Sequence, residues 1–197
     1  MEVTSYMRKY YVLSVVHPVF VYPGVNCATL SRIPAMAAED MEEIAQYASW
    51  HAANTMKRYR ADAQRDESKV RRHYDSLCSS GVFSNEFCSV YEQMAWAAAW
   101  STASERFGTK KDARLYKKKW LDFHMELFRS KEVTSQLAND LRSLCWSSAW
   151  YTANTRKGYR RDAEADVREM DVYYDRIRIL IHTQARLRMK MDNAVAA

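Results

Sequence analysis

Hydrophobic and polar positions follow a helical spacing along most of the chain. Apolar or small residues stand at positions 41, 44, 45, 48 and 52, which follow the i, i+3, i+4, i+7 and i+11 spacing of one buried helix face. The matching residues one hundred positions later are Leu141, Leu144, Cys145, Ser148 and Thr152. A second apolar face follows each first one, carried in one stretch by Ala63, Val70, Tyr74 and Leu77. The pattern therefore predicts helices that come in pairs.

An internal repeat of fifty residues underlies this pattern. Trp50, Trp100 and Trp150 stand fifty residues apart, and their surroundings align without gaps as WHAANTMKRYRADA, WSTASERFGTKKDA and WYTANTRKGYRRDA. A fixed period without insertions is typical of repeated supersecondary units. The sequence thus predicts three helix hairpins, at about residues 34–82, 83–132 and 133–190.

Capping residues mark where the helices begin. Ser84 and Thr134 are suited to N-caps, and each follows an apolar residue that can serve as a hydrophobic staple. Pro34 takes the equivalent place in the first copy, where proline fits a first helical turn. We therefore expect the helical region to start at residue 34.

The turn inside each hairpin is marked by glycine in two of the three copies. Gly108 and Gly158 stand where a left-handed C-cap would end the first helix. Thr109, with Asp112 three residues later, is typical of a capping box that opens the second helix. The first copy has Arg58 instead, so residues 37–79 could also form one helix of about 60 Å.

These observations predict an all-α fold of three tandem helix hairpins, arranged as a short solenoid or as a helical bundle. We favour the solenoid, with 34–197 as the helical repeat domain. Residues 1–33 do not match the repeat and contain Pro18 and Pro23, so we expect a non-helical arm or hairpin. Such an arm can cover an open end or exchange between subunits of an oligomer.

Composition removes several classes of function. The four glycines, Gly24, Gly81, Gly108 and Gly158, lie too far apart for a dinucleotide-binding G-x-G-x-x-G turn or a P-loop. The four cysteines form no C-x-x-C pair, so neither a zinc site nor a disulfide framework is indicated. The longest apolar run, residues 10–22, is too short to span a bilayer. We expect a cytoplasmic protein without cofactor or metal that does not contact a membrane.

Positive charge is concentrated in the three hairpin turns. Residues 56–61, 106–111 and 156–161 hold 10 of the 30 Lys and Arg residues and no acid, while the net charge of the whole chain is +6. The rest of the chain is therefore slightly acidic. In a stacked repeat, equivalent positions line up along one edge, about 8–10 Å apart. The sequence thus predicts one basic ridge.

A phosphate-containing ligand suits such a ridge, because arginine binds phosphate oxygens bidentately. We therefore expect a non-enzymatic protein that binds a nucleotide, an oligonucleotide or RNA. The predicted phosphate-binding residues are Lys57, Arg58, Arg60, Arg106, Lys110, Lys111, Arg156, Lys157, Arg160 and Arg161. The predicted base-contacting residues, which offer amides and aromatic rings, are Asn54, Tyr59, Asn154 and Tyr159.

Two alternatives remain open from the sequence. The same ridge could dock an acidic partner protein, making the chain an adaptor or inhibitor. The chain could also be a helical enzyme that processes nucleotides, since Arg176 and His182 have a spacing similar to the R-x(4–6)-H motif of small helical ribonucleases. Among 19 arginines and five histidines this match arises easily by chance, and we assign no catalytic residue.

Overall fold

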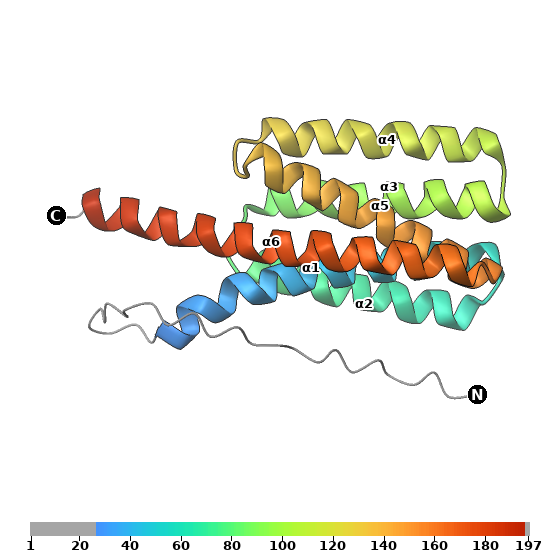
Figure 1. Ribbon diagram of the computed structural model, residues 1–197, viewed down its shortest axis with the longest axis horizontal. Coiled ribbons are helices and arrows are strands. Elements are labelled where there is room, and N and C mark those ends of the chain that lie inside the picture. The colour runs from blue at the N-terminus through green and yellow to red at the C-terminus, as the bar shows by residue number, and fades with distance from the viewer. Residues whose placement is uncertain (1–26, 196–197) are drawn as a thin grey trace.

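Six helices joined by short turns make up the protein (Figure 1). The computed structural model describes residues 27–195, and side chains within 33–187. The helices are α1 (Cys27–Met56), α2 (Arg60–Ser79), α3 (Asn85–Phe107), α4 (Lys110–Arg129), α5 (Ser135–Lys157) and α6 (Arg160–Val195). The predicted all-α class is confirmed, and each copy of the sequence repeat folds into one antiparallel pair.

The three hairpins close into a bundle. The inner helices α1, α3 and α5 all pack against one another, and each outer helix also contacts the inner helix of the next hairpin, with α6 returning to α1. In an open solenoid the first and third units would not meet. The favoured solenoid is therefore wrong, and the bundle is the arrangement adopted. One reason lies in the inner helices, where successive residues such as Ala97, Ala98 and Ala99 are all buried, so that several sides of the helix pack closely.

The first hairpin turns without a glycine. Arg58 adopts a left-handed conformation with φ of 63°, and Gly158 does the same with φ of 86°. In both copies the next tyrosine donates its backbone N–H to an asparagine carbonyl five residues earlier, at 2.8 Å from Tyr59 and 2.9 Å from Tyr159. These are the hydrogen bonds of a Schellman C-cap. The alternative of one helix over residues 37–79 is therefore wrong.

The remaining predicted caps differ in outcome. Ser84, Thr109 and Thr134 each accept a hydrogen bond from the backbone N–H three residues later, as expected of N-caps. Gly108 ends α3 but has φ of −118°, so the left-handed conformation predicted for it is wrong. Its small size matters instead, because a Cβ there would lie 3.2 Å from the Cα of Ser104.

The first helix begins earlier than expected. α1 starts at Cys27 and continues through Pro34, so residues 27–33 are helical and the predicted boundary at residue 34 is wrong. Proline suits a first turn but does not require one, and inside a helix it removes one hydrogen bond and crowds the carbonyl four residues earlier. The rest of the proposed N-terminal arm, residues 1–26, lies outside the described residues.

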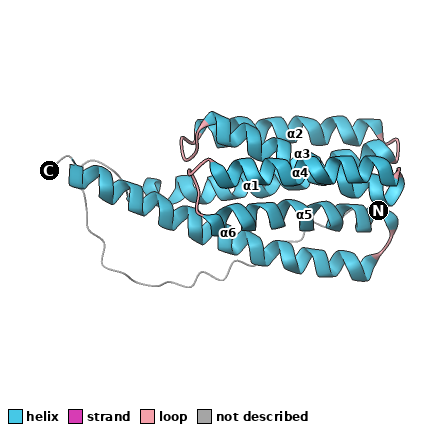
Figure 2. Ribbon diagram, turned by 90° about the horizontal axis from the view of Figure 1, so that it is seen from above, coloured by secondary structure: helices cyan, strands magenta, loops and turns pink. Residues whose placement is uncertain are grey.

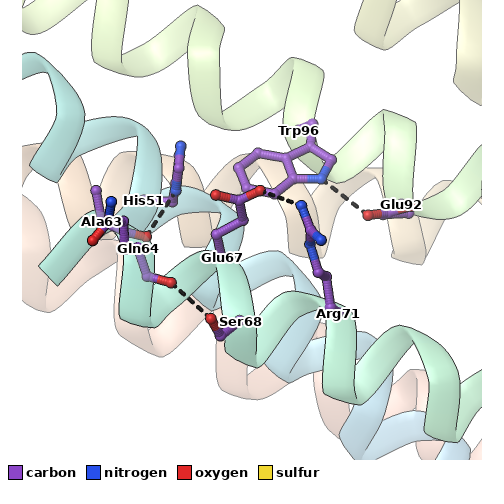
Figure 3. Close-up of polar contacts among 8 residues, drawn as sticks. All are labelled: His51, Ala63, Gln64, Glu67, Ser68, Arg71, Glu92 and Trp96. Carbon is purple, nitrogen blue, oxygen red and sulfur yellow. Dashed lines mark hydrogen bonds and ion pairs between the residues drawn. The ribbon is translucent and has the colours of Figure 1, made fainter. Parts of the chain in front are cut away.

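Aromatic and polar side chains tie the hairpins together. His51 of α1 pairs with the carbonyl oxygen of Ala63 in α2 at 2.9 Å, and its ring meets Trp96 of α3 edge-on at 5.0 Å (Figure 3). Trp50 contacts Tyr151 of the third hairpin, and the Trp120 ring stacks on Trp146 across the second and third. Tryptophans thus pack at the junctions between repeats.

The last helix is the longest. α6 has 36 residues, whereas α2 and α4 have 20 each. Its C-terminal part extends past the ends of the neighbouring helices, on the same side as the beginning of α1 (Figures 1 and 2). Within the described part of the chain, no helix has the length and apolar composition needed to cross a bilayer.

Candidate functional site

The three basic segments meet at one end of the bundle. The inner helices α1, α3 and α5 all end at the same end of the bundle, so the turns α1–α2, α3–α4 and α5–α6 lie together (right-hand end of Figure 1). Contacts join the turns in pairs: the Arg106 guanidinium lies 5.0 Å from the Tyr159 ring, and that of Arg156 lies 5.3 Å from the Tyr59 ring. The predicted ridge along one edge is therefore replaced by a compact cluster, which we call the basic end (residues 56–61, 106–111 and 156–161).

Equivalent residues of the three repeats surround the centre of the basic end. Phe107 lies between the first and third hairpins, with the ammonium of Lys57 at 5.5 Å and that of Lys157 at 5.9 Å from the ring centroid. The three residues occupy the same position in the repeat. Attraction of each cation to the ring partly compensates for bringing two like charges close together.

Two arginines fill the gaps between hairpins. The Arg106 guanidinium lies over Trp150 at 4.7 Å, and that of Arg156 lies over Trp50 at 4.8 Å. Both side chains are half-buried, and their Nε atoms are buried without a hydrogen-bond partner. Met56 is the equivalent residue of the first hairpin and approaches Gly108 of the second. Because the first repeat has an apolar methionine where the other two have Arg106 and Arg156, these two arginines mainly serve packing between the hairpins.

The other eight predicted phosphate-binding residues are exposed. They are Lys57, Arg58, Arg60, Lys110, Lys111, Lys157, Arg160 and Arg161. Within the described part of the chain, none of them pairs with a carboxylate within 4.0 Å. The arginines that do form ion pairs, such as Arg65 and Arg71, lie further along the outer helices. The basic end thus carries a dense positive charge, and the acids next to it in the sequence are Asp62, Asp112 and Asp162 in the first turns of α2, α4 and α6.

The asparagines predicted to contact bases are buried instead. Asn54 is 1% exposed and its amide donates to Asp66 at 2.8 Å, while Asn154 is 3% exposed and donates to Asp166 at 2.7 Å. The sequence could not separate the two roles, because an asparagine amide that can hydrogen-bond a base can equally hydrogen-bond an aspartate on the neighbouring helix. The sequence did carry a signal, since the middle copy replaces both members of the pair, with Ser104 and Tyr116.

Burial raises the pKa of both aspartates in these pairs. Desolvation of the charged carboxylate is the largest cause for Asp66 and for Asp166, and the asparagine hydrogen bond acts in the opposite direction. The positive charge of Arg106 opposes the rise in the pKa of Asp166, less strongly than the hydrogen bond from Asn154 does. Each pair therefore fixes an inner helix to its outer helix just behind the turn.

The two tyrosines lie at the surface of the basic end. Tyr59 is 47% exposed and Tyr159 is 44% exposed, but each ring also has an arginine from the neighbouring hairpin against it. The tyrosines thus contact the guanidinium groups and leave part of each ring exposed.

Other candidate residues lie outside the basic end. The Arg176 guanidinium of α6 pairs with Asp140 of α5 at 2.9 Å, so it joins two helices of the third hairpin. Among the described residues, no group of His, Cys, Asp and Glu has the arrangement of a metal site. A cavity of about 280 Å³ lies between the start of α3 and the end of α4, lined by residues that include Glu86, Glu126 and Leu127.

Comparisons with known proteins add no family: no protein-family model, curated protein or solved structure matches the chain.

Proposed function

We propose that the chain is a binding protein whose basic end holds a phosphate-containing ligand, of the class formed by nucleotides, oligonucleotides and RNA. The observation that carries the proposal is the set of eight exposed cations from three hairpins, gathered at one end, none of which pairs with a carboxylate within 4.0 Å among the described residues. Bringing so many like charges together is unfavourable unless counter-ions or an anionic ligand compensate for them.

The fold supplies further support for an anion. α2, α4 and α6 all begin at this end, with Arg60, Lys110 and Arg160 as their first residues. The first backbone N–H groups of a helix lack partners within it and favour negative charge. Guanidinium and ammonium groups around three such helix starts suit several phosphate groups better than one.

The proposed recognition is of phosphate rather than of base sequence. Asn54 and Asn154 are occupied by aspartates inside the bundle, which leaves only partly covered tyrosine rings beside the cations. Contacts to the phosphate backbone give affinity that is insensitive to sequence and decreases steeply with salt. We therefore expect similar affinity for single strands of different sequence.

A charge-reversal experiment tests the proposal. Arg60→Glu combined with Arg160→Glu places acids at exposed first positions of α2 and α6, where the helix dipole accepts them. Fluorescence anisotropy with a labelled single-stranded RNA should show a loss of affinity of about tenfold or more at low salt, and a shallower dependence on salt. Circular dichroism should show unchanged helical content.

The matched control changes the same number of charges on the same helices. Arg72→Glu with Arg168→Glu alters exposed arginines outside the basic end and should leave affinity within about twofold. Unchanged RNA affinity in the Arg60/Arg160 variant, or affinity that does not depend on salt, would contradict the proposal. Equal binding of a polyglutamate of the same charge would favour an acidic protein partner over phosphate.

A further inference from the structure

The exposed face of α4 differs from that of its two counterparts. Arg114, Lys118, Leu121, Met125 and Phe128 follow one another at intervals of four, three, four and three residues, so they form one stripe along the helix. The three apolar members are 41% to 43% exposed. We call this row of five residues the α4 stripe.

The repeat itself shows what the fold requires at these positions. The equivalent residues are Gln64, Ser68, Arg71, Asp75 and Cys78 in α2, and Glu164, Arg168, Asp171, Asp175 and Arg178 in α6. All but one of these ten are polar, because the face points away from the inner helices. Packing of the bundle therefore does not explain why α4 has apolar residues at three neighbouring positions of this face, Leu121, Met125 and Phe128. Exposed apolar residues in such a row, unlike scattered ones, mark an interaction surface.

The charge around the α4 stripe defines the partner. Outside the basic end, α4 has five basic and three acidic residues, whereas α2, of the same length, has four of each. Within the described part of the chain neither Arg114 nor Lys118 forms an ion pair. On the α5 side, Arg142 lies over the Trp120 ring at 6.0 Å and adds a further cation beside α4. The apolar half of the stripe thus continues into a half that is basic and unneutralised.

We infer that the α4 stripe is a docking surface for an amphipathic helix of another protein, with apolar residues at three- and four-residue spacing and acidic residues beside them. Such a helix would place its apolar row on Leu121, Met125 and Phe128 and its acids against Arg114 and Lys118. This surface is separate from the basic end, and the inference does not depend on the proposed function.

Charge disfavours three other occupants. Residues 10–22 of the same chain contain no acid. On α6 of a second copy, the exposed Val172 and Ile179 have both acids, Asp171 and Asp175, and bases, Arg168 and Arg178, beside them, so that face presents no acidic row to the cations of α4. An anionic bilayer needs a broad apolar face, whereas the stripe is one residue wide and α4 also exposes Asp122 and Glu126.

The repeat provides the variant that tests the inference. Leu121→Asp, Met125→Asp and Phe128→Arg together give α4 the residues that α6 already has at these positions, so the fold tolerates them. The probe is a stapled helical peptide with leucine at three- and four-residue spacing and flanking glutamates. Fluorescence anisotropy should show binding to the full chain and a loss of about tenfold or more in the triple variant.

Controls separate the α4 stripe from general stickiness. The same peptide with lysines for glutamates should not bind, and Leu115→Asp, which changes a residue 52% exposed on another side of α4, should alter affinity by less than about twofold. If the triple variant has an altered circular dichroism spectrum, the single Met125→Asp variant takes its place and should also weaken binding. Equal binding of both peptides, or no effect of these variants, overturns the inference.

Three further outcomes identify the disfavoured occupants. A photoreactive residue at position 125 should crosslink to the glutamate peptide. Crosslinks to residues 1–26, association of two copies that the triple variant abolishes, or stripe-dependent binding of phosphatidylserine vesicles without peptide binding would each overturn the inference.

Discussion

Arg58 occupies a backbone conformation that glycine adopts at the equivalent place, so Arg58→Gly should stabilise the protein. Its φ of 63° falls in the left-handed region, as does the φ of 86° at Gly158. A residue with a Cβ loses roughly 1–2 kcal/mol in this conformation, whereas glycine loses about 0.4–1 kcal/mol through its greater freedom in the unfolded chain. The expected net gain is therefore about 0.5–1 kcal/mol.

The position contributes little else that would offset this gain. Arg58 is exposed, makes no ion pair within the described part of the chain, and lies between the end of α1 and the start of α2. The two helix dipoles therefore act on its charge in opposite directions. Urea unfolding followed by circular dichroism should give a higher midpoint with the same slope, and thermal unfolding a rise of about 1–4 °C in Tm.

The repeat also offers matched controls for this reasoning. Lys131 has φ of 60° where the first hairpin has Gly81 with φ of 66°, so Lys131→Gly should stabilise to a similar extent far from the basic end. Gly158→Ala should be destabilising although no atom lies within 4 Å of the added Cβ, because only the φ angle opposes it. A destabilised Arg58→Gly together with a stabilised Lys131→Gly would refute the argument for Arg58.

Three further predictions concern the junctions. Burial raises the pKa of Asp66 and Asp166 above 3.8. The stability that their protonated forms contribute is therefore complete below pH 3.8 and is lost as the pH rises through the raised pKa. The double variant Asp66→Asn with Asp166→Asn should show a smaller decrease in the free energy of unfolding over the same pH range, measured by unfolding at a series of pH values. Arg156→Met, which copies Met56, should cost less than about 1 kcal/mol, whereas Arg156→Ala should cost about 1–2 kcal/mol in urea unfolding, because the side-chain stem packs between hairpins. Thr109→Ala should cost about 1 kcal/mol by the same measurement, since Thr109 caps α4.

Local features of the fold were predictable because local chemistry decides them. Ser84, Thr109 and Thr134 cap helices through their own hydroxyl groups, and this preference is visible in any sequence. The closure of the three hairpins into a bundle was not predictable in the same way. Period and spacing specify the hairpins but not the angle between successive hairpins, which depends on how buried alanines such as Ala98 and Ala103 let the inner helices approach.

The candidate site shows the same division. Gathering of the basic segments followed from the repeat, since equivalent turns must lie at equivalent places in any symmetric arrangement. The roles of single residues did not follow, because asparagine and arginine serve packing and binding equally well. Asn54 proved to be a buried partner of Asp66, and Arg106 a half-buried packing residue between Trp150 and Tyr159.

Comparison among the three repeats separates residues that serve the fold from residues that do not. Where two copies share a buried pair and the third replaces both members, as at Asn54 and Asp66, the pair serves packing. Where one copy alone departs from a solvent-exposed polar pattern, as at Met125, the fold offers no reason for the change. The exposed cations belong to neither class, since all three turns are basic although their sequences differ. Positive charge is thus common to the three turns although the middle turn places it on different residues, which supports the proposal of a surface that attracts an anion through its field rather than through one fixed contact.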